Sequence, residues 1–263
     1  MKFHFLIFTI LFSYAYIHTS TITNQPNCKP KILILIAMSD NLPVYQKLQT
    51  LWRKYMHSNS KHIVAYFIRG KDSLNAEWII DKDTIWTKTV ENYIPGMVNK
   101  TILSMEAMLP QINDFDYILR TTVSSFFIFP RLIKFLENCP SKCFYCSVPG
   151  YDNKNECLYG SGAGFIITPD IVKMLVRDKK NILNNMSNYD DVLIGKYLSN
   201  HQIILTRYDR LDLFNTNDWT KFMKNIPKNI FHIKVKHIEP DKRMAFDPYV
   251  YSKLLTMFYG LVA

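Results

Sequence analysis

The sequence is poor in glycine and in acidic residues. It holds 8 glycines in 263 residues, and 22 Asp and Glu against 32 Lys and Arg. The low glycine content excludes a collagen-like chain, and a hydrophobic fraction of 48% excludes wholesale disorder. The net charge of +10 suits anionic partners such as nucleic acids, acidic membranes or nucleotide diphosphates, but charge alone does not choose among them.

Several familiar catalytic motifs are also absent. The sequence has no Walker-type phosphate loop, no G-x-G-x-x-G after its first predicted strand, no G-x-S-x-G and no H-E-x-x-H. These absences count against phosphate-loop nucleotide enzymes and the common hydrolase classes. Beyond the N-terminus, no uncharged run approaches the roughly 18 residues of a membrane-spanning helix, so a protein with several spans is excluded.

The N-terminus carries a secretory signal. Lys2 and His4 precede an apolar run from Phe5 to Ile17, which would span roughly 20 Å as a helix, against a hydrocarbon core of roughly 30 Å. We predict a signal peptide or signal anchor over residues 1–20, with cleavage favoured. A short linker over residues 21–30 and one domain over residues 31–263 follow. The domain is expected in the lumen of the endoplasmic reticulum or Golgi, or outside the cell.

The cysteines are interpreted in that oxidising compartment. The Cys143-x-x-Cys146 spacing suits zinc, but no second close pair completes a zinc site, so disulfides are favoured. Their pairing stays open, and so does the state of Cys28. The cluster comprises Cys139, Cys143, Cys146 and Cys157. Two sequons allow glycosylation: Asn99-Lys100-Thr101 and Asn185-Met186-Ser187.

Strand and helix patterns alternate along the rest of the chain, without internal repeats. This alternation predicts a single α/β domain with a mainly parallel central sheet flanked by helices, and a ligand site at the carboxyl edge of the sheet. The predicted strands are Ile32–Ile36, His62–Ile68, Tyr117–Arg120, Phe144–Val148, Phe165–Thr168 and Ile230–Lys236. The predicted helices are Val44–Met56, Met97–Leu109, Pro130–Glu137, Pro169–Val176, Asp190–Leu198 and Pro248–Phe258.

Two segments stand out as candidates for chemistry. The glycine-rich stretch from Tyr159 to Phe165 either forms a tight connection between strands or lets a ligand approach the backbone. Asp190 and Asp191 open a predicted helix, where an aspartate can cap the first turn. Adjacent carboxylates point in different directions, so one of them can cap the helix while the other acts as a general base in a cleft.

These segments occur in an order that resembles a known enzyme family. Tyr159-Gly160-Ser161-Gly162-Ala163-Gly164-Phe165 is similar to Y-x-S-G-x-G-Y, and Asp190-Asp191-Val192 is similar to E-D-V about thirty residues later. Weaker similarities cover Ile34 to Ser39 with Leu51-Trp52-Arg53, Tyr66 to Gly70, and Glu91 to Thr101. Most of the chain thus resembles the β-1,3-galactosyltransferase and N-acetylglucosaminyltransferase type family, including Fringe-like enzymes, which have the GT-A nucleotide-sugar fold.

The resemblance implies an inverting glycosyltransferase. It would move a sugar from a nucleotide sugar, usually linked to uridine diphosphate (UDP), to a hydroxyl of a glycan or glycoprotein. Asp191 would be the general base, with Asp190 as its acceptor-site or capping neighbour. Residues implied near the nucleotide are Ser39, Arg53 and Lys100, and those implied at the donor–acceptor junction are Ser161, Gly162 and Gly164. Tyr159 is a further candidate for substrate binding. The alternative is a catalytically inactive lumenal relative that binds carbohydrate or nucleotide.

The sequence departs from the family at the metal site. Where the family has K-x-D-D-D-x-F, this chain has Arg120-Thr121-Thr122-Val123-Ser124-Ser125-Phe126, so the carboxylates that usually hold Mn²⁺ are missing and Thr122 and Ser124 offer neutral hydroxyls. Cationic side chains are one substitute for the metal, and His232 could be a metal ligand. The candidate cations are Arg120, Lys234, Lys236 and Arg243. A nucleic-acid-binding role for the lysines between Lys221 and Arg243 is disfavoured, because no recognition motif accompanies them.

Overall fold

The computed structural model describes residues 29–153, 156–184, 189–223 and 225–262. The predicted signal or anchor, most of the predicted linker, Cys28 and the sequon at Asn185 lie outside these residues, so those assignments stay predictions. Within the described ranges, no helix has the length and apolar character that crossing a membrane requires.

A large mixed sheet forms the centre of the molecule. Its strand order is β3-β4-β2-β1-β5-β8-β7-β9. The stretch β4-β2-β1-β5 is parallel, β8 runs antiparallel to both β5 and β7, β3 is antiparallel to β4, and β9 is parallel to β7. The bounds are β1 (Ile32–Ala37), β2 (Ile63–Gly70), β3 (Trp78–Asp81), β4 (Thr84–Thr87), β5 (Tyr117–Thr122), β7 (Tyr145–Asp152), β8 (Cys157–Ile167) and β9 (Leu205–Arg207).

A second, smaller sheet lies beside the first. Its order is β10-β11-β6, with β10 parallel and β6 antiparallel to β11. The bounds are β6 (Ser125–Phe127), β10 (Arg210–Leu213) and β11 (His232–Val235). Because β6 follows β5 after a two-residue turn, the small sheet begins at the carboxyl edge of the large one.

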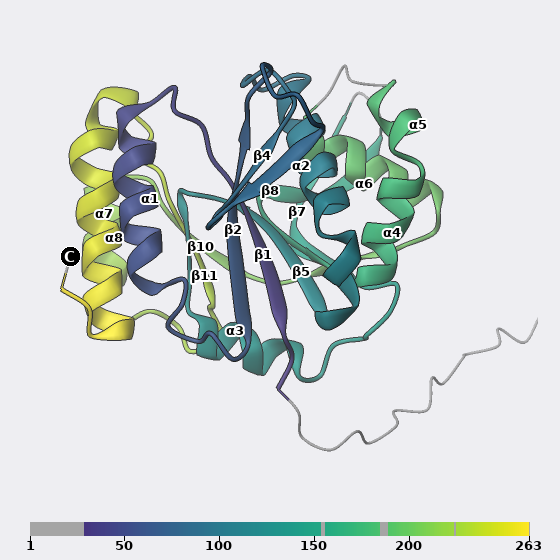
Figure 1. Ribbon diagram of the computed structural model, residues 1–263. Coiled ribbons are helices and arrows are strands. Elements are labelled where there is room, and N and C mark those ends of the chain that lie inside the picture. The colour runs from purple at the N-terminus through teal and green to yellow at the C-terminus, as the bar shows by residue number, and fades with distance from the viewer. Residues whose placement is uncertain (1–28, 154–155, 185–188, 224, 263) are drawn as a thin grey trace, which may run out of the picture.

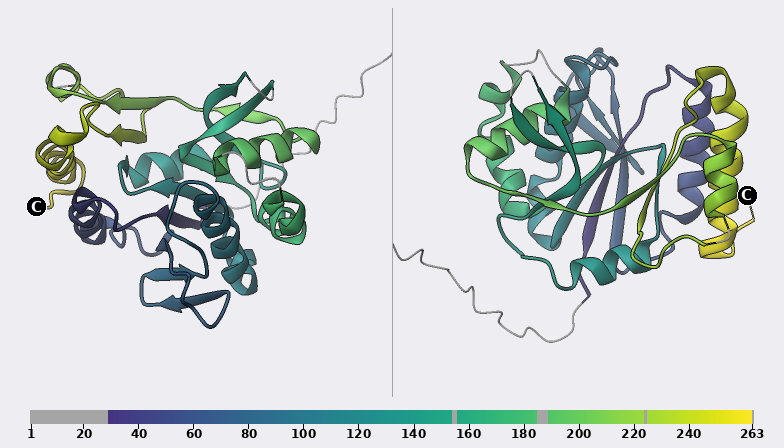
Figure 2. Two further views of the ribbon diagram at one scale, coloured as in Figure 1. Left: turned by 90° about the horizontal axis from the view of Figure 1, so that it is seen from above. Right: turned by 180° about the vertical axis from the view of Figure 1, so that it is seen from behind.

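Helices cover both faces of the central sheet (Figures 1 and 2). One face packs against α1 (Pro43–Tyr55), α3 (Phe129–Leu136) and α8 (Arg243–Tyr259), and the other against α2 (Gly96–Ala107), α4 (Pro169–Arg177), α5 (Lys179–Leu183) and α6 (Asp190–Asn200). The helix α7 (Thr216–Phe222) lies by β10, and short 3₁₀ helices span Leu109–Asp114 and Pro240–Lys242. The α/β prediction is therefore confirmed.

The first strand shows why the sequence folds in this way. Ile32, Ile34 and Ile36 pack in the core on the α1 and α8 face, whereas Leu33 and Leu35 pack on the α2 face. Strand side chains alternate between the two faces of a sheet, so a continuous aliphatic run is the pattern of a strand buried on both sides. The prediction from Ile32 to Ile36 is confirmed, and the strand extends to Ala37.

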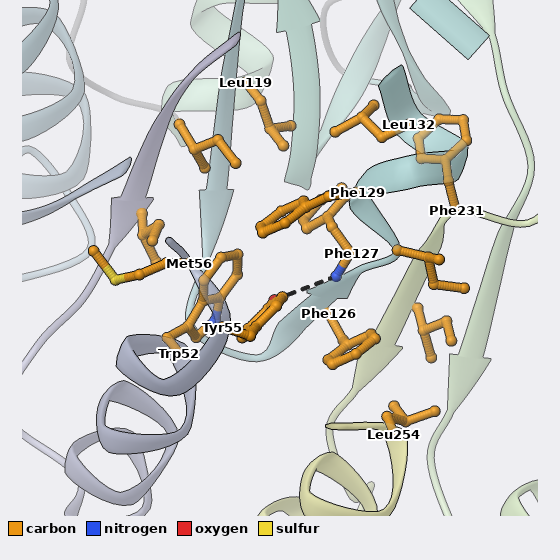
Figure 3. Packing of buried hydrophobic residues seen from close by; sticks show 14 of the residues in the cluster. Trp52, Tyr55, Met56, Leu119, Phe126, Phe127, Phe129, Leu132, Phe231 and Leu254 are labelled. Atoms are coloured by element: carbon orange, nitrogen blue, oxygen red, sulfur yellow. Dashed lines mark hydrogen bonds between the residues drawn. The ribbon is translucent and has the colours of Figure 1, made fainter. Parts of the chain in front are cut away.

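An aromatic cluster holds the chain where β5 leads into β6 (Figure 3). Trp52 and Tyr55 of α1 pack against the rings of Phe127 and Phe129. The indole Nε1 of Trp52 donates a 3.0 Å hydrogen bond to the carbonyl of Val123. Large buried aromatic side chains contribute strongly to core stability, so this cluster fixes the strand end that borders the candidate site.

The structure differs from the predicted elements in several places. The glycine-rich segment is not a connection, because it lies inside the long strand β8. The last helix begins at Arg243 rather than Pro248, and an ion pair from Arg243 to Asp247 braces its first turn. The hairpin of β3 and β4 was missed, and its two-residue turn places Lys82 at φ 53°.

The predicted disulfides are wrong for the cysteines that the structure describes. Cys139, Cys143, Cys146 and Cys157 are free thiols. Cys146 lies opposite Ile166 in the β7–β8 pair and Cys157 lies opposite Asp152, so these two thiols are at different ends of the hairpin. Cys143 is exposed and donates its backbone N–H to Asp170. The close spacing in sequence therefore does not bring these thiols into bonding positions.

Candidate functional site

A cleft opens at the carboxyl ends of β1 and β5. Its volume is about 360 Å³. Polar and cationic groups come from β5, from the turn after it and from β11, while aromatic and aliphatic groups come from the segments after β1 and before α2. The lining residues are Ala37, Met38, Ser39, Asn41, Leu42, Tyr45, Glu91, Asn92, Tyr93, Met97, Thr122, Val123, Ser124, Lys234 and Lys236. This is the edge of the sheet where the sequence predicts a ligand.

Asp190 and Asp191 lie in the first turn of α6. Asp190 is buried, and its Oδ2 lies 2.5 Å from Nη2 of Arg120 and accepts a 2.9 Å hydrogen bond from Thr101. The N-cap of the helix is Tyr189, with no side-chain cap. Asp190 therefore neutralises a buried guanidinium, and the predicted capping role is wrong.

Asp191 has different surroundings. It is half-buried, its Oδ2 accepts a 2.7 Å hydrogen bond from the N–H of Gly162, and its Oδ1 accepts one from Val192 at 3.0 Å. Burial raises the pKa of this carboxyl, and the negative charge of Asp190 raises it further. A carboxylate with a raised pKa is a stronger base, so Asp191 suits proton abstraction near neutral pH.

The glycines of β8 make room for this arrangement. None of them needs a left-handed backbone, because Gly260 is the single glycine at positive φ among the described residues. A Cβ on Gly162 would lie 2.8 Å from Oδ2 of Asp191 and 3.2 Å from Nη1 of Arg120. A Cβ on Gly164 would lie 2.8 Å from Cε1 of His232. The glycines therefore permit close approach of side chains to the strand, including the candidate base.

Arg120 connects Asp191 to the cleft. Its guanidinium pairs with Asp190 and donates to the carbonyl of Gly162, whose N–H holds Asp191. Thr122, a cleft residue, follows Arg120 by two positions on β5, which is roughly 7 Å along a strand. The candidate base and the cleft thus border the same stretch of β5.

Most of the basic residues predicted to contact a nucleotide already hold carboxylates. Lys100 is buried under the cleft, where it donates to the carbonyl of Met38 at 2.7 Å and pairs with Glu91. Such pairs leave little charge for a ligand. The other pairs are Arg53 with Asp83, Arg120 with Asp190, and Arg243 with Asp247.

Lys234 and Lys236 differ from those residues. Both line the cleft, and no carboxylate of the described chain lies within ion-pair distance of either. Lys234 is half-buried and its Nζ donates a 2.8 Å hydrogen bond to Oγ1 of Thr122. Burial lowers the pKa of Lys234 well below its usual range, and the nearby Arg210 lowers it further. The cleft therefore holds two lysines without a carboxylate partner in the described part of the chain, and burial disfavours the charged form of Lys234.

His232 lies behind the cleft in a packed setting. Its ring is fully buried and stacks on Phe127 with 4.3 Å between ring centroids, and its Nδ1 lies 2.9 Å from the hydroxyl of Tyr208. Burial lowers the pKa of this imidazole well below its usual range. The Nε2 atom has no hydrogen-bond partner. Its predicted role as a metal ligand stays a prediction.

The cleft does not fit the Mn²⁺ that the family resemblance implies. Within the described ranges, no three or more His, Cys, Asp or Glu side chains gather where they could hold a metal ion. Glu91 is the carboxylate among the cleft residues, and it is bound to Lys100 and to the N–H of Gly70. Mn²⁺ prefers anionic oxygen ligands, and the hydroxyls of Thr122 and Ser124 do not supply them.

Some predicted site residues lie elsewhere. Arg53 is bound to Asp83 and lines a separate surface hollow of about 640 Å³. Tyr159 packs against the backbone of α6, because a Cβ on Gly195 would lie 2.4 Å from its Cβ. Ser161 accepts a 3.0 Å hydrogen bond from Arg210. Neither Arg53 nor Tyr159 lines the cleft.

Sequence reasoning missed several residues near the site. Tyr45 and Tyr93 line the cleft, and Arg210 binds both Ser161 and Asp212. Tyr45 could have been found, because it lies in the first turn of a helix that follows a strand end. Arg210 gave no such signal, because β10 has only four residues, too few for its alternation to be recognised from the sequence.

Comparisons with known proteins bear on the fold. No family model and no curated protein matches the sequence. The chain is similar to a glycosyltransferase involved in the glycosylation of the major capsid of PBCV-1, with 10% identity, a TM-score of 0.52, and coverage of 84% of this chain and 99% of that one. It is also similar to the catalytic domain of Drosophila β1,4-galactosyltransferase 7, with 12% identity, a TM-score of 0.41, and coverage of 83% and 74%. The first similarity shows that the chain has a GT-A-like glycosyltransferase fold.

Proposed function

We propose that this protein is an inverting glycosyltransferase that moves a hexose from a nucleotide sugar to a hydroxyl of a glycan or glycoprotein in the secretory pathway. The observation that carries the proposal is the half-buried Asp191, a carboxylate with a raised pKa, beside a cleft that holds unpaired lysines. The GT-A-like fold supports it, because such folds place ligands at the carboxyl edge of the sheet. The proposed donor is UDP-linked, because the family that the sequence resembles usually uses such donors.

The chemistry needs a base on one side of the sugar and charge stabilisation on the other. Asp191 takes the proton of the acceptor hydroxyl as its oxygen attacks the anomeric carbon. The bond from that carbon to the diphosphate oxygen breaks, and the diphosphate leaves with the electron pair. Attack opposite the leaving group inverts the anomeric configuration. The aromatic rings of Tyr45 and Tyr93 offer apolar surfaces to the nucleoside.

The proposed transfer needs no divalent metal. Neutral side chains stand where the family that the sequence resembles has its acidic cluster, and the basic cleft residues without an ion-pair partner within the described ranges are Lys234 and Lys236. A cationic site can stabilise a departing diphosphate electrostatically, since positive groups fixed in advance act where negative charge develops.

Release of nucleotide from a panel of nucleotide sugars tests the proposal. The full-length protein is assayed with mono- and disaccharide acceptors, and the anomeric configuration of the product is determined by NMR. We expect Asp191→Asn to lower turnover by about 10²- to 10⁴-fold, which is the usual contribution of a general base. The matched control is Asp209→Asn, because Asp209 is an exposed aspartate paired with Arg207.

Three outcomes would contradict the proposal. Turnover that is equal in Asp191→Asn and native protein would remove Asp191 from the base role. A product that retains the configuration of the donor would exclude the single-displacement chemistry. Donor binding without turnover on any acceptor would favour the inactive carbohydrate- or nucleotide-binding alternative.

A further inference from the structure

The basic residues around the cleft divide into two groups. Those with carboxylate partners are already neutralised, because a short ion pair satisfies the charge of both groups. They include Lys100, Arg120 and Arg243. Lys234 and Lys236 form the second group, without a carboxylate partner among the described residues. A ligand that brings negative charge to the cleft would therefore meet these two lysines.

The strand β11 explains why the two lysines act together. Successive side chains on a strand alternate in direction, so residues two apart share a side. Lys234 lies in β11 and Lys236 directly follows its last residue. The backbone N–H of Val235, between them, donates a 2.8 Å hydrogen bond to the carbonyl of Ser124. This bond fixes the backbone between the two lysines to the turn after β5, which borders the cleft.

A nearby carboxylate does not neutralise Lys234. Asp212 lies opposite Lys234 in the β10–β11 register. Both of its carboxylate oxygens accept hydrogen bonds from Arg210, at 2.6 and 3.1 Å. The ammonium of Lys234 instead donates to the neutral hydroxyl of Thr122. Partial burial without a counter-charge disfavours the protonated form of a lysine, and a bound anion would favour that form.

We propose that Lys234 and Lys236 form a binding site for the diphosphate of the donor and take the place of the divalent metal. This inference rests on the proposed function and names the residues that hold the leaving group. It reduces the candidate cations predicted from the sequence to these two lysines, because Arg120 is paired with Asp190 and Arg243 is paired with Asp247. Lys234, held by Thr122, is the anchored member of the pair, and the exposed Lys236 is the freer one.

Binding measurements test this site without relying on turnover. Isothermal titration calorimetry with the full-length protein in EDTA uses UDP, inorganic pyrophosphate and uridine as probes. We expect UDP and pyrophosphate to bind in EDTA. Each of the changes Lys234→Met and Lys236→Met should weaken both by about 10- to 100-fold, the loss expected for a hydrogen bond to a charged group. Uridine, which lacks phosphate, should be unaffected by either change.

A matched control separates this site from general charge effects. Lys242 is exposed and bonded to Glu239, so Lys242→Met removes the same charge away from the cleft. We expect it to leave UDP affinity within about twofold, because exposed charges at a distance are screened by salt. Thermal melting of each variant verifies that it is folded.

The results distinguish failure of this site from failure of the proposed function. UDP binding that requires Mn²⁺, or that is unchanged in both lysine variants, would overturn the lysine site even if the protein transfers sugar. Lysine-dependent binding of UDP in EDTA by a protein that never turns over would support the site and overturn the proposed enzyme. A loss of UDP affinity in Lys242→Met as large as that in the cleft variants would also overturn the site, because the loss would then follow from the lower net charge of the protein.

Discussion

Removal of the negative charge of Asp190 should destabilise the protein strongly. The Arg120–Asp190 pair is buried, with 2% and 5% of the two side chains exposed. Breaking such a pair from one side costs about 3–5 kcal/mol, because the remaining charge stays buried without a partner. We expect Asp190→Asn to fall at the lower end, about 3 kcal/mol, because the amide oxygen can still accept the hydrogen bond from Thr101 and because Asp191 stays nearby.

Urea denaturation measures this loss. With a typical slope of about 1–3 kcal/mol per molar urea, a loss of about 3 kcal/mol lowers the unfolding midpoint by about 1 M or more at constant slope. Asp209→Asn is the control, because the Arg207–Asp209 pair is exposed, at 74% and 58%, and should cost at most about 1 kcal/mol. Equal midpoints for the two variants would refute the assignment of Asp190 as the partner of a buried guanidinium.

A second change identifies the cause of the loss. In the Asp190→Asn background, Arg120→Met removes the unpaired charge and retains an unbranched side chain. We expect the double variant to recover part of the lost free energy, because apolar replacement of a buried pair is often close to neutral. If Arg120→Met instead adds its full cost to that of Asp190→Asn, the two side chains do not act as a pair.

Three further predictions concern single residues. Burial and Asp190 raise the pKa of Asp191 in the folded protein, so the free energy of unfolding of the native protein should fall as pH rises from the unfolded pKa of this carboxyl through its folded pKa. In urea melts from pH 4 to 8, the stability of Asp191→Asn relative to the native protein should therefore increase with pH. A stability difference that stays constant over this range would contradict the prediction. Gly195→Ala should lower the free energy of unfolding, measured by urea melts, by about 1–3 kcal/mol, because the new Cβ would lie 2.4 Å from Cβ of Tyr159. An unchanged unfolding midpoint would show that β8 moves to accommodate the methyl group. Alkylation followed by mass spectrometry should label the exposed Cys143 before the buried Cys146; the reverse order would contradict the described burial.

Local patterns in the sequence were sufficient for the main elements. The aliphatic run of β1 and the helical spacing of Val44 to Met56 depend on the alternation and periodicity of side chains, which neighbouring residues encode. The same holds for the start of α6 at Asp190. Short elements such as β9 and β10 carry too few residues for a period to be recognised, so Arg210 was missed with its strand.

The candidate site could be predicted in outline but not in its pairings. Whether a lysine or arginine is free depends on residues far along the chain. Arg120 meets Asp190, and Lys234 meets Thr122 across 112 positions. No local spacing records such contacts. From the sequence alone, Arg120 and Lys234 are therefore equal candidates for binding the leaving diphosphate. The structure distinguishes them, because Arg120 has a carboxylate partner and Lys234 has a neutral one.

The two aspartates of α6 show how one local feature can serve both stability and chemistry. Consecutive residues on a helix point about 100° apart, so Asp190 reaches Arg120 on β5 while Asp191 faces the backbone of Gly162 on β8. The charge that Asp190 supplies to Arg120 also raises the pKa of Asp191. Loss of that charge in Asp190→Asn should therefore lower the pKa of Asp191 and move the acid limb of any Asp191-dependent activity to lower pH. A folded Asp190→Asn protein with an unchanged acid limb would show that burial alone sets the base strength of Asp191.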